Sequence, residues 1–264
     1  MKTQPFANFM RVLLVTASLV AGLQACDQED AAPSGQNPTP DNPAPAAANV
    51  KLTNNATLGN VLTDKDGRTL YFFTKDADGT SVCTGGCLAA WPLFYEKEIA
   101  PGQGLNAADF GVITRADGAK QTTYKGLPLY RFANDAAAGD AKGEGLGTTW
   151  FVAKPDYTVF LADKDGAKFL VDGNAKGKTL YLFGDDADNV STCNGGCLTN
   201  WPEFSTEKVV APSLLKAEDF ASITRADQKK QLTYKKRPLY FFAGDQVRGD
   251  VKGKAIAKWA LAVN

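Results

Sequence analysis

The sequence predicts an all-β protein made of two tandem homologous antiparallel β domains. Each domain is expected to be barrel-like or sandwich-like, to contain two smaller repeat units and to include short helical turns. Three observations predict this fold: a long block recurs 110 positions later, a weaker repeat lies inside each copy, and short aromatic segments alternate with Asp-Gly turns.

The long block defines the domain organisation. Residues 70–73, Cys83, Cys87 and Trp91 recur as residues 180–183, Cys193, Cys197 and Trp201. The register continues, because the segment Ile-Thr-Arg-Ala-Asp at 113–117 returns at 223–227. We therefore expect a first repeat domain over residues 50–155 and a second over residues 156–264, each long enough for its own core.

The weaker repeat is a Tyr-x-Phe-x-x-Asp motif that occurs four times, twice in each domain. Its residues are Tyr71, Phe73 and Asp76; Tyr130, Phe132 and Asp135; Tyr181, Phe183 and Asp186; and Tyr240, Phe242 and Asp245.

In a strand, Tyr71 and Phe73 point to one face and Leu70 and Phe72 to the other, so the motif strand is apolar on both faces. Asp76 then follows the strand, where a carboxylate commonly accepts hydrogen bonds from turn amides. We interpret the motif as core packing plus a turn cap. The alternative is a binding rim of repeated tyrosines and aspartates.

Turn residues divide each domain into short strands. The Asp-Lys-Asp-Gly segments at 64–67 and 163–166 favour tight turns, the second between strands at 157–161 and 168–171. Residues 116–118 link strands at 110–115 and 120–125, and helical signal is confined to pieces near 87–91 and 106–110 and their counterparts. We expect about six or seven strands per domain.

Residues 1–25 have the features of a lipoprotein signal peptide. Lys2 and Arg11 bracket a basic region, an apolar run covers residues 12–23, and Leu-Gln-Ala-Cys at 23–26 resembles a bacterial lipobox. This resemblance implies cleavage before Cys26 and lipidation of Cys26, which would anchor the chain to a membrane. An ordinary secretory signal with a coincidental cysteine is the alternative.

The next segment, residues 26–49, predicts a disordered tether rich in Pro and Ala. Asp27 resembles an inner-membrane retention signal, whereas Asp27, Glu29 and Asp30 together resemble surface-export signals. We expect a lipid-anchored protein of the bacterial cell envelope, with the outer membrane or cell surface favoured over the periplasmic face of the inner membrane.

Composition restricts the chemistry. The chain has no histidine, and both methionines, Met1 and Met10, lie in the signal segment. This excludes His-dependent triads, His-ligated haem and metal sites built on imidazole or thioether from the mature chain. Lys and Arg total 29 against 29 Asp and Glu, and removal of Lys2 and Arg11 leaves 27 against 29. Such a balance gives no electrostatic reason to expect nucleic acid as a partner.

The four domain cysteines form two close pairs, Cys83 with Cys87 and Cys193 with Cys197. In an oxidising compartment, a local disulfide in each domain is the leading interpretation. The alternatives are reversible thiol–disulfide chemistry and a four-cysteine metal site. Calcium at the carboxylates of 76–79 or 185–189 is a further alternative, although solvated turns explain them better. We expect no cofactor and no metal.

Taken together, the Tyr-x-Phe-x-x-Asp motif, Cys-x-Gly-Gly-Cys-x-x-x-Trp-Pro and the Gly-Asp segments behind a lipobox resemble the secreted-repeat lipoproteins with a Yx(FWY)xxD motif. The resemblance covers nearly all of residues 50–264. Two departures are Gln228 in place of Gly118, and Trp259, which lies one residue nearer its Gly-Asp pair than Trp150 does. The resemblance implies a small envelope-exposed repeat domain and brings no assigned activity.

From these features we expect a non-catalytic binding or structural module and no enzyme. Its partners would be a membrane, through the N-terminal lipid, and an unidentified envelope partner or ligand. The alternative function is thiol–disulfide exchange or electron transfer in the envelope, with the cysteine pairs and the nearby Trp91 and Trp201 as active groups.

Overall fold

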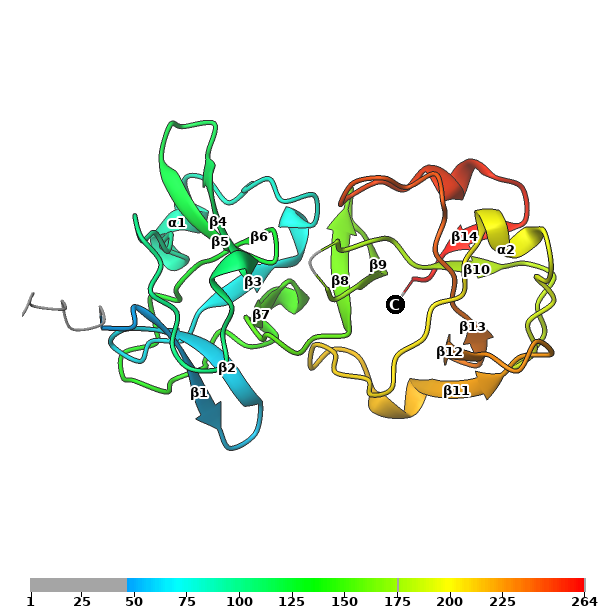
Figure 1. Cartoon of the computed structure of the whole chain (residues 1–264). Coiled ribbons are helices and arrows are strands. Elements are labelled where there is room, and N and C mark those ends of the chain that lie inside the picture. The colour runs from blue at the N-terminus through cyan, green and yellow to red at the C-terminus, as the bar shows by residue number, and fades with distance from the viewer. Residues whose placement is uncertain (1–46, 175, 264) are drawn as a thin grey trace, which may run out of the picture. The chain divides into compact units, whose positions relative to one another are not determined.

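A computed structural model describes residues 47–174 and 176–263 (Figure 1). The predicted signal peptide, the lipidated Cys26 and nearly all of the tether lie outside the described residues. The described residues belong to one compact unit. No helix among the described residues has both the length and the apolar character needed to cross a membrane.

We refer to residues 50–155 as the first half and to residues 156–263 as the second half. The first half contains β1 (Val50–Asn55), β2 (Gly59–Asp64), β3 (Tyr71–Phe73), α1 (Gly86–Ala90), β4 (Phe110–Thr114), β5 (Lys120–Tyr124), β6 (Leu127–Pro128) and β7 (Trp150–Val152). The second half contains β8 (Val159–Lys164), β9 (Ala167–Asp172), β10 (Tyr181–Phe183), α2 (Cys197–Asn200), β11 (Phe220–Thr224), β12 (Lys230–Tyr234), β13 (Arg237–Pro238) and β14 (Trp259–Leu261). Single 3-10 turns are η1 (Thr74–Asp76), η2 (Ala107–Asp109), η3 (Leu146–Thr148), η4 (Ala217–Asp219) and η5 (Lys252–Ala255).

The strands form six small antiparallel sheets, three in each half. In the first half they are β1-β2, β3-β7 and β4-β5-β6, and the second half repeats them as β8-β9, β10-β14 and β11-β12-β13. Each half thus has seven strands in the described residues, which confirms the predicted all-β class and strand number. Within the described residues none of the sheets closes into a barrel.

The predicted hairpin turns are present. β8 and β9 pair from Val159↔Asp172 to Lys164↔Ala167, so Asp165 and Gly166 form a two-residue turn, with φ of 55° and 80°. Both residues are left-handed, as a type I′ hairpin requires. Between β11 and β12, Gln228 has φ of 66° where Gly118 has 82°. The departure from glycine therefore keeps the same turn conformation.

Strand β3 is buried on both faces, as predicted. Leu70 and Phe72 belong to one apolar cluster, whereas Tyr71 and Phe73 belong to another that also contains Trp91 and Trp150. The period-2 alternation of the strand accounts for this division. The second half has an equivalent aromatic cluster around Tyr181, Trp201 and Trp259.

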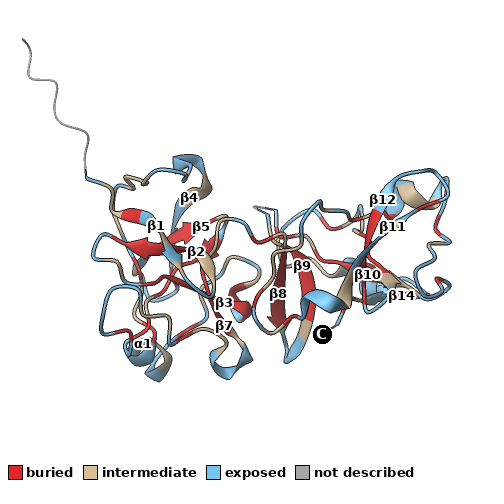
Figure 2. Cartoon of the chain, turned by 90° about the horizontal axis from the view of Figure 1, so that it is seen from below, coloured by how far each residue is buried: buried red, intermediate tan, exposed pale blue. Residues whose placement is uncertain are grey.

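The apolar cluster that contains Leu70 and Phe72 includes residues from both halves. Phe160 on β8 contacts Phe72 edge to face, with ring centroids 5.7 Å apart, and Phe151 at 6.3 Å. Figure 2 shows β8 and β9 as buried strands, and every residue of β8 except Lys164 is buried. The two halves therefore share a core, and the domain boundary near residue 155 stays a prediction.

Candidate functional site

The Tyr-x-Phe-x-x-Asp motifs pair within each half, and they exchange hydrogen bonds. In the first half the Tyr71 hydroxyl donates to Asp135 Oδ2 at 2.6 Å, and the Tyr130 hydroxyl donates to Asp76 Oδ2 at 2.6 Å. Each tyrosine thus bonds the aspartate of the other copy. The backbones meet at the same place, because Tyr71 N donates to Tyr130 O at 2.9 Å and Tyr130 N donates to Tyr71 O at 3.1 Å.

The second half repeats this exchange. Tyr181 donates to Asp245 at 2.6 Å, and Tyr240 donates to Asp186 at 2.7 Å. The backbone pair between Tyr181 and Tyr240 is also present, at 2.8 and 3.0 Å. All four copies of the motif therefore use their tyrosine and aspartate in the same way.

The other carboxylate oxygen of each motif aspartate accepts a backbone N–H. Asp76 Oδ1 accepts from Val82 N at 2.8 Å, and Asp135 Oδ1 accepts from Lys142 N at 3.0 Å. Asp186 and Asp245 accept in the same way from Thr192 N and Lys252 N. The aspartates thus cap turns as expected, and in addition they fix the tyrosines.

In the first half, burial shifts the pKa values of the paired groups. It raises the pKa of Asp76 to about 7, although the Tyr130 hydroxyl and the Val82 N–H favour the carboxylate and lower it in part. Burial and the neighbouring aspartates raise the pKa of Tyr71 and Tyr130 well above the usual value of a phenol. Both tyrosines therefore remain protonated donors at any physiological pH.

The motif phenylalanines form the ends of a four-ring stack. Phe73 stacks on Trp150 with centroids 4.1 Å apart, Trp150 stacks on Trp91 at 3.8 Å, and Trp91 stacks on Phe132 at 4.4 Å. The second half builds the same series from Phe183, Trp259, Trp201 and Phe242, at 4.5, 3.6 and 4.4 Å. The shifted sequence position of Trp259 leaves this stack intact.

Both predicted disulfides are present. Cys83 bonds Cys87 and Cys193 bonds Cys197, with Cα atoms 5.5 and 5.4 Å apart. Cys83 is buried in the aromatic cluster of Trp91, whereas Cys87 is half-buried and the loop at 84–86 is exposed. Each pair is closed within its own loop. Among the described residues no three His, Cys, Asp or Glu side chains gather as a metal site.

A buried arginine lies beside each disulfide, and the sequence analysis did not identify it. Arg115 Nη2 donates to Cys83 O at 2.6 Å, and its Nη1 donates to Ser81 Oγ. Ser81 Oγ in turn lies 2.6 Å from the Tyr130 hydroxyl. Arg115 therefore joins the cysteine loop to the Tyr130–Asp76 pair.

The second half has the same network, in which Arg225 Nη2 donates to Cys193 O at 2.7 Å and Ser191 Oγ lies 2.6 Å from the Tyr240 hydroxyl. The sequence does contain a pattern that indicates this network. The polar residues Ser81, Arg115 and Gln121 recur 110 positions later as Ser191, Arg225 and Gln231.

The arrangement joins its polar groups to one another. In each half, one Tyr–Asp pair is joined through a serine and an arginine to the cysteine loop, as Tyr130–Asp76 is through Ser81 and Arg115. The other pair meets it through the backbone bonds between the two tyrosines. Buried polar groups that are satisfied in this way help to specify one packing of the core. It brings together all the sequence-predicted motif residues, their tryptophans and the cysteine pairs.

Comparison with known proteins agrees with this internal symmetry. A family described as a secreted repeat of unknown function matches the chain four times, at residues 52–94, 111–154, 161–204 and 221–262. No curated protein and no solved structure shows significant similarity to the chain. Each match contains one copy of the Tyr-x-Phe-x-x-Asp motif, and together the four matches cover more than half of the sequence. The chain therefore belongs to this family of secreted repeats of unknown function.

Proposed function

We propose that this protein is a lipid-anchored module of the bacterial cell envelope that binds or organises a partner without catalysing a reaction. The observation that carries the non-catalytic part is the reciprocal Tyr–Asp exchange. The residues that the repeat keeps in all four copies bond one another inside the fold. Residues used in this way stabilise the scaffold, and they leave the exposed loops for binding.

The lipid anchor rests on the lipobox-like segment at 23–26 and on the secreted character of the family. We predict that Cys26→Ser abolishes labelling by a radioactive fatty acid and releases the protein from membranes into the soluble fraction. Cys83→Ser/Cys87→Ser serves as the control, because its cysteines lie in the folded half and it should still be labelled. Continued membrane association of the Cys26→Ser protein would refute the anchor.

One observation favours a second function, thiol–disulfide exchange. Cys87 is half-buried in an exposed loop, and the buried Arg115 cation is bonded to the backbone of Cys83. A neighbouring cation favours a thiolate once a disulfide is reduced. The partial exposure of Cys87 and Cys197 supports access of a reductant to each disulfide.

The reduction potential separates the two functions. A structural disulfide should have a potential below about −300 mV, whereas a functional couple should lie well above that value. We predict the low value for both pairs, measured by equilibrating the native protein in dithiothreitol buffers and trapping free thiols by alkylation. A potential near that of a strong protein oxidant would replace the binding module by the redox function.

A further inference from the structure

An arginine of the second half is bound by a turn of the first half. Arg248 Nη2 donates to the backbone carbonyl of Lys125 at 2.7 Å and to that of Asn174 at 3.2 Å. Gly79 lies beside the same side chain, since a Cβ at Gly79 would stand 3.9 Å from Arg248 Cδ. The guanidinium is therefore held between the Lys125 carbonyl of the first half and the Asn174 carbonyl of the second half, and Gly79 leaves room for its aliphatic stem.

The second half contains a duplicate of this turn. Lys235 and Asn189 correspond to Lys125 and Gly79 across the 110-residue repeat. The backbone is held in the same way, because Lys125 N donates to Asp109 O and Lys235 N donates to Asp219 O, both at 2.7 Å. Lys125 and Lys235 also have nearly equal φ, 48° and 47°. The carbonyl of Lys235 therefore occupies the position equivalent to the arginine-binding carbonyl of Lys125.

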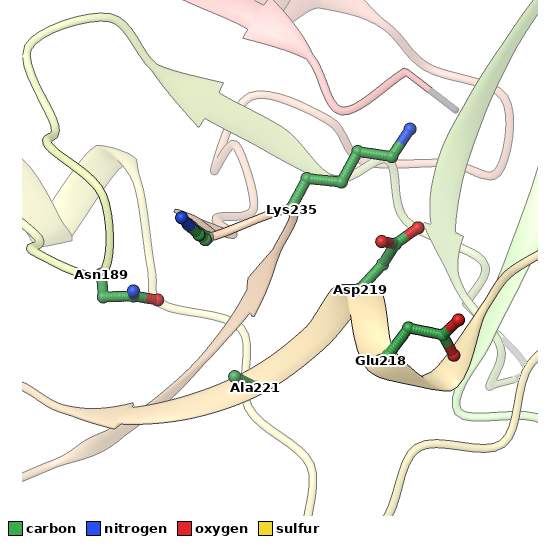
Figure 3. Close-up of a pocket in the computed structure, with 6 residues that line it drawn as sticks. Asn189, Glu218, Asp219, Ala221 and Lys235 are labelled. Atoms are coloured by element: carbon green, nitrogen blue, oxygen red, sulfur yellow. The ribbon is translucent and has the colours of Figure 1, made fainter.

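In the second half this place is an open pocket. Its volume is about 390 Å³, and it is lined by Asn189, Glu218, Asp219, Ala221, Lys235 and Lys236 (Figure 3). Lys125 and Gly79 are half-buried in the first half, whereas their counterparts Lys235 and Asn189 are exposed. The same surface is thus covered in one copy and open to solvent in the other.

The pocket has two carboxylates and two lysines, and the carboxylates lie together. Glu218 stands where the first half has Ala108, so the pocket has two carboxylates, and Figure 3 shows the Glu218 and Asp219 side chains next to each other at one end of it. Of the two lysines, Lys236 lies 3.6 Å from Asp188, and Lys235 Nζ lies 5.0 Å from the centre of the Tyr234 ring. A planar guanidinium can bond a carboxylate and a turn carbonyl at the same time, which a lysine ammonium does less well.

We propose that this pocket binds an arginine side chain presented on a turn of an envelope partner, with the Lys235 carbonyl in the role that the Lys125 carbonyl has for Arg248 and with the carboxylates of Glu218 and Asp219 beside it. The inference names the chemistry of the partner and rests on the proposed binding role. It is independent of the lipid anchor, which Cys26→Ser tests separately.

Titration of the full chain with arginine, followed by NMR, tests the proposal. The probes are arginine amide, lysine amide as the matched cation, and a peptide with the sequence of residues 244–252. Arginine amide and the peptide should shift the backbone signals of Asn189, Asp219 and Lys235, whereas lysine amide should shift them much less. Equal responses to arginine and lysine, or no response at these residues, would overturn the proposal.

Two variants make the test specific. Glu218→Ala should weaken arginine binding by about two- to fivefold, the effect of one exposed ion pair. The matched variant Ala108→Glu adds the same carboxylate to the first half, where Arg248 already occupies the turn, and it should leave arginine binding unchanged. Unaltered binding by Glu218→Ala, or a gain of binding by Ala108→Glu, would contradict the proposed site.

Discussion

At the scale of single residues, the tyrosine, the phenylalanine and the aspartate of each Tyr-x-Phe-x-x-Asp motif each contact the other repeat unit of the same half. The tyrosine hydroxyl donates to the aspartate of the other copy, as in Tyr71 to Asp135. The phenylalanine closes one end of the tryptophan stack, as Phe73 and Phe132 do. Because the copies are related in this reciprocal way, the three residues must be kept together at fixed spacing.

The raised pKa of Asp76 predicts an unusual dependence of stability on pH. Burial gives Asp76 a pKa of about 7 in the folded chain, against 3.8 for an ordinary aspartate. Between these two values the folded state holds a proton that the unfolded state has lost. The contribution of Asp76 is therefore fully present below pH 3.8 and decreases as the pH rises to about 7, by at most about 1.4 kcal/mol per pH unit.

We predict that Asp76→Asn removes this part of the slope. The measurement is the free energy of unfolding in urea at several pH values between about 4 and 7. Asp165→Asn is the control, because Asp165 is exposed on the β8–β9 turn and is not among the groups that act on the pKa of Asp76, so its replacement should preserve the slope. An identical pH profile for Asp76→Asn and the unaltered chain would contradict the assignment.

At the scale of elements, the local features were predictable from the sequence and the reciprocal pairing was not. The turn at Asp165 and Gly166 follows from two adjacent residues that tolerate positive φ. The two faces of β3 follow from strand alternation. The hydrogen bond between Tyr71 and Asp135 joins residues 64 positions apart, and no local sequence pattern predicts that Asp135 is the partner of Tyr71.

The buried position of Arg115 is a second feature that the sequence does not predict. A charged residue at the end of a strand is normally solvated, because burial of an unpaired charge is costly. Here Ser81, Gln121 and the Cys83 carbonyl accept hydrogen bonds from the guanidinium, and Asp117 lies 3.3 Å from Arg115 Nε. These partners come together only in the folded chain, so the sequence marks Arg115 by its repetition alone.

At the scale of the whole molecule, the duplication gives each half its own aromatic cluster, while β8 of the second half covers part of the first. We predict that residues 50–155 expressed alone unfold cooperatively, because their strands pair among themselves. Their stability should be lower than in the full chain, since loss of Phe160 uncovers Phe72 and Phe151. Thermal unfolding by circular dichroism checks this. A molten or aggregated product would indicate one interleaved fold of four units.

Hydrogen bonds exchanged between copies hold the repeats together, and a pair of double-mutant cycles on the free energy of unfolding tests this most directly. For the pair Tyr130→Phe and Asp76→Ala, which lies across copies, we predict a coupling of about 1–3 kcal/mol, because each change leaves a buried group without its partner. For Tyr71→Phe and Asp76→Ala, which lie in one copy of the motif, we predict near-additive effects. Additive effects in the first cycle, or equal coupling in both, would contradict the exchange.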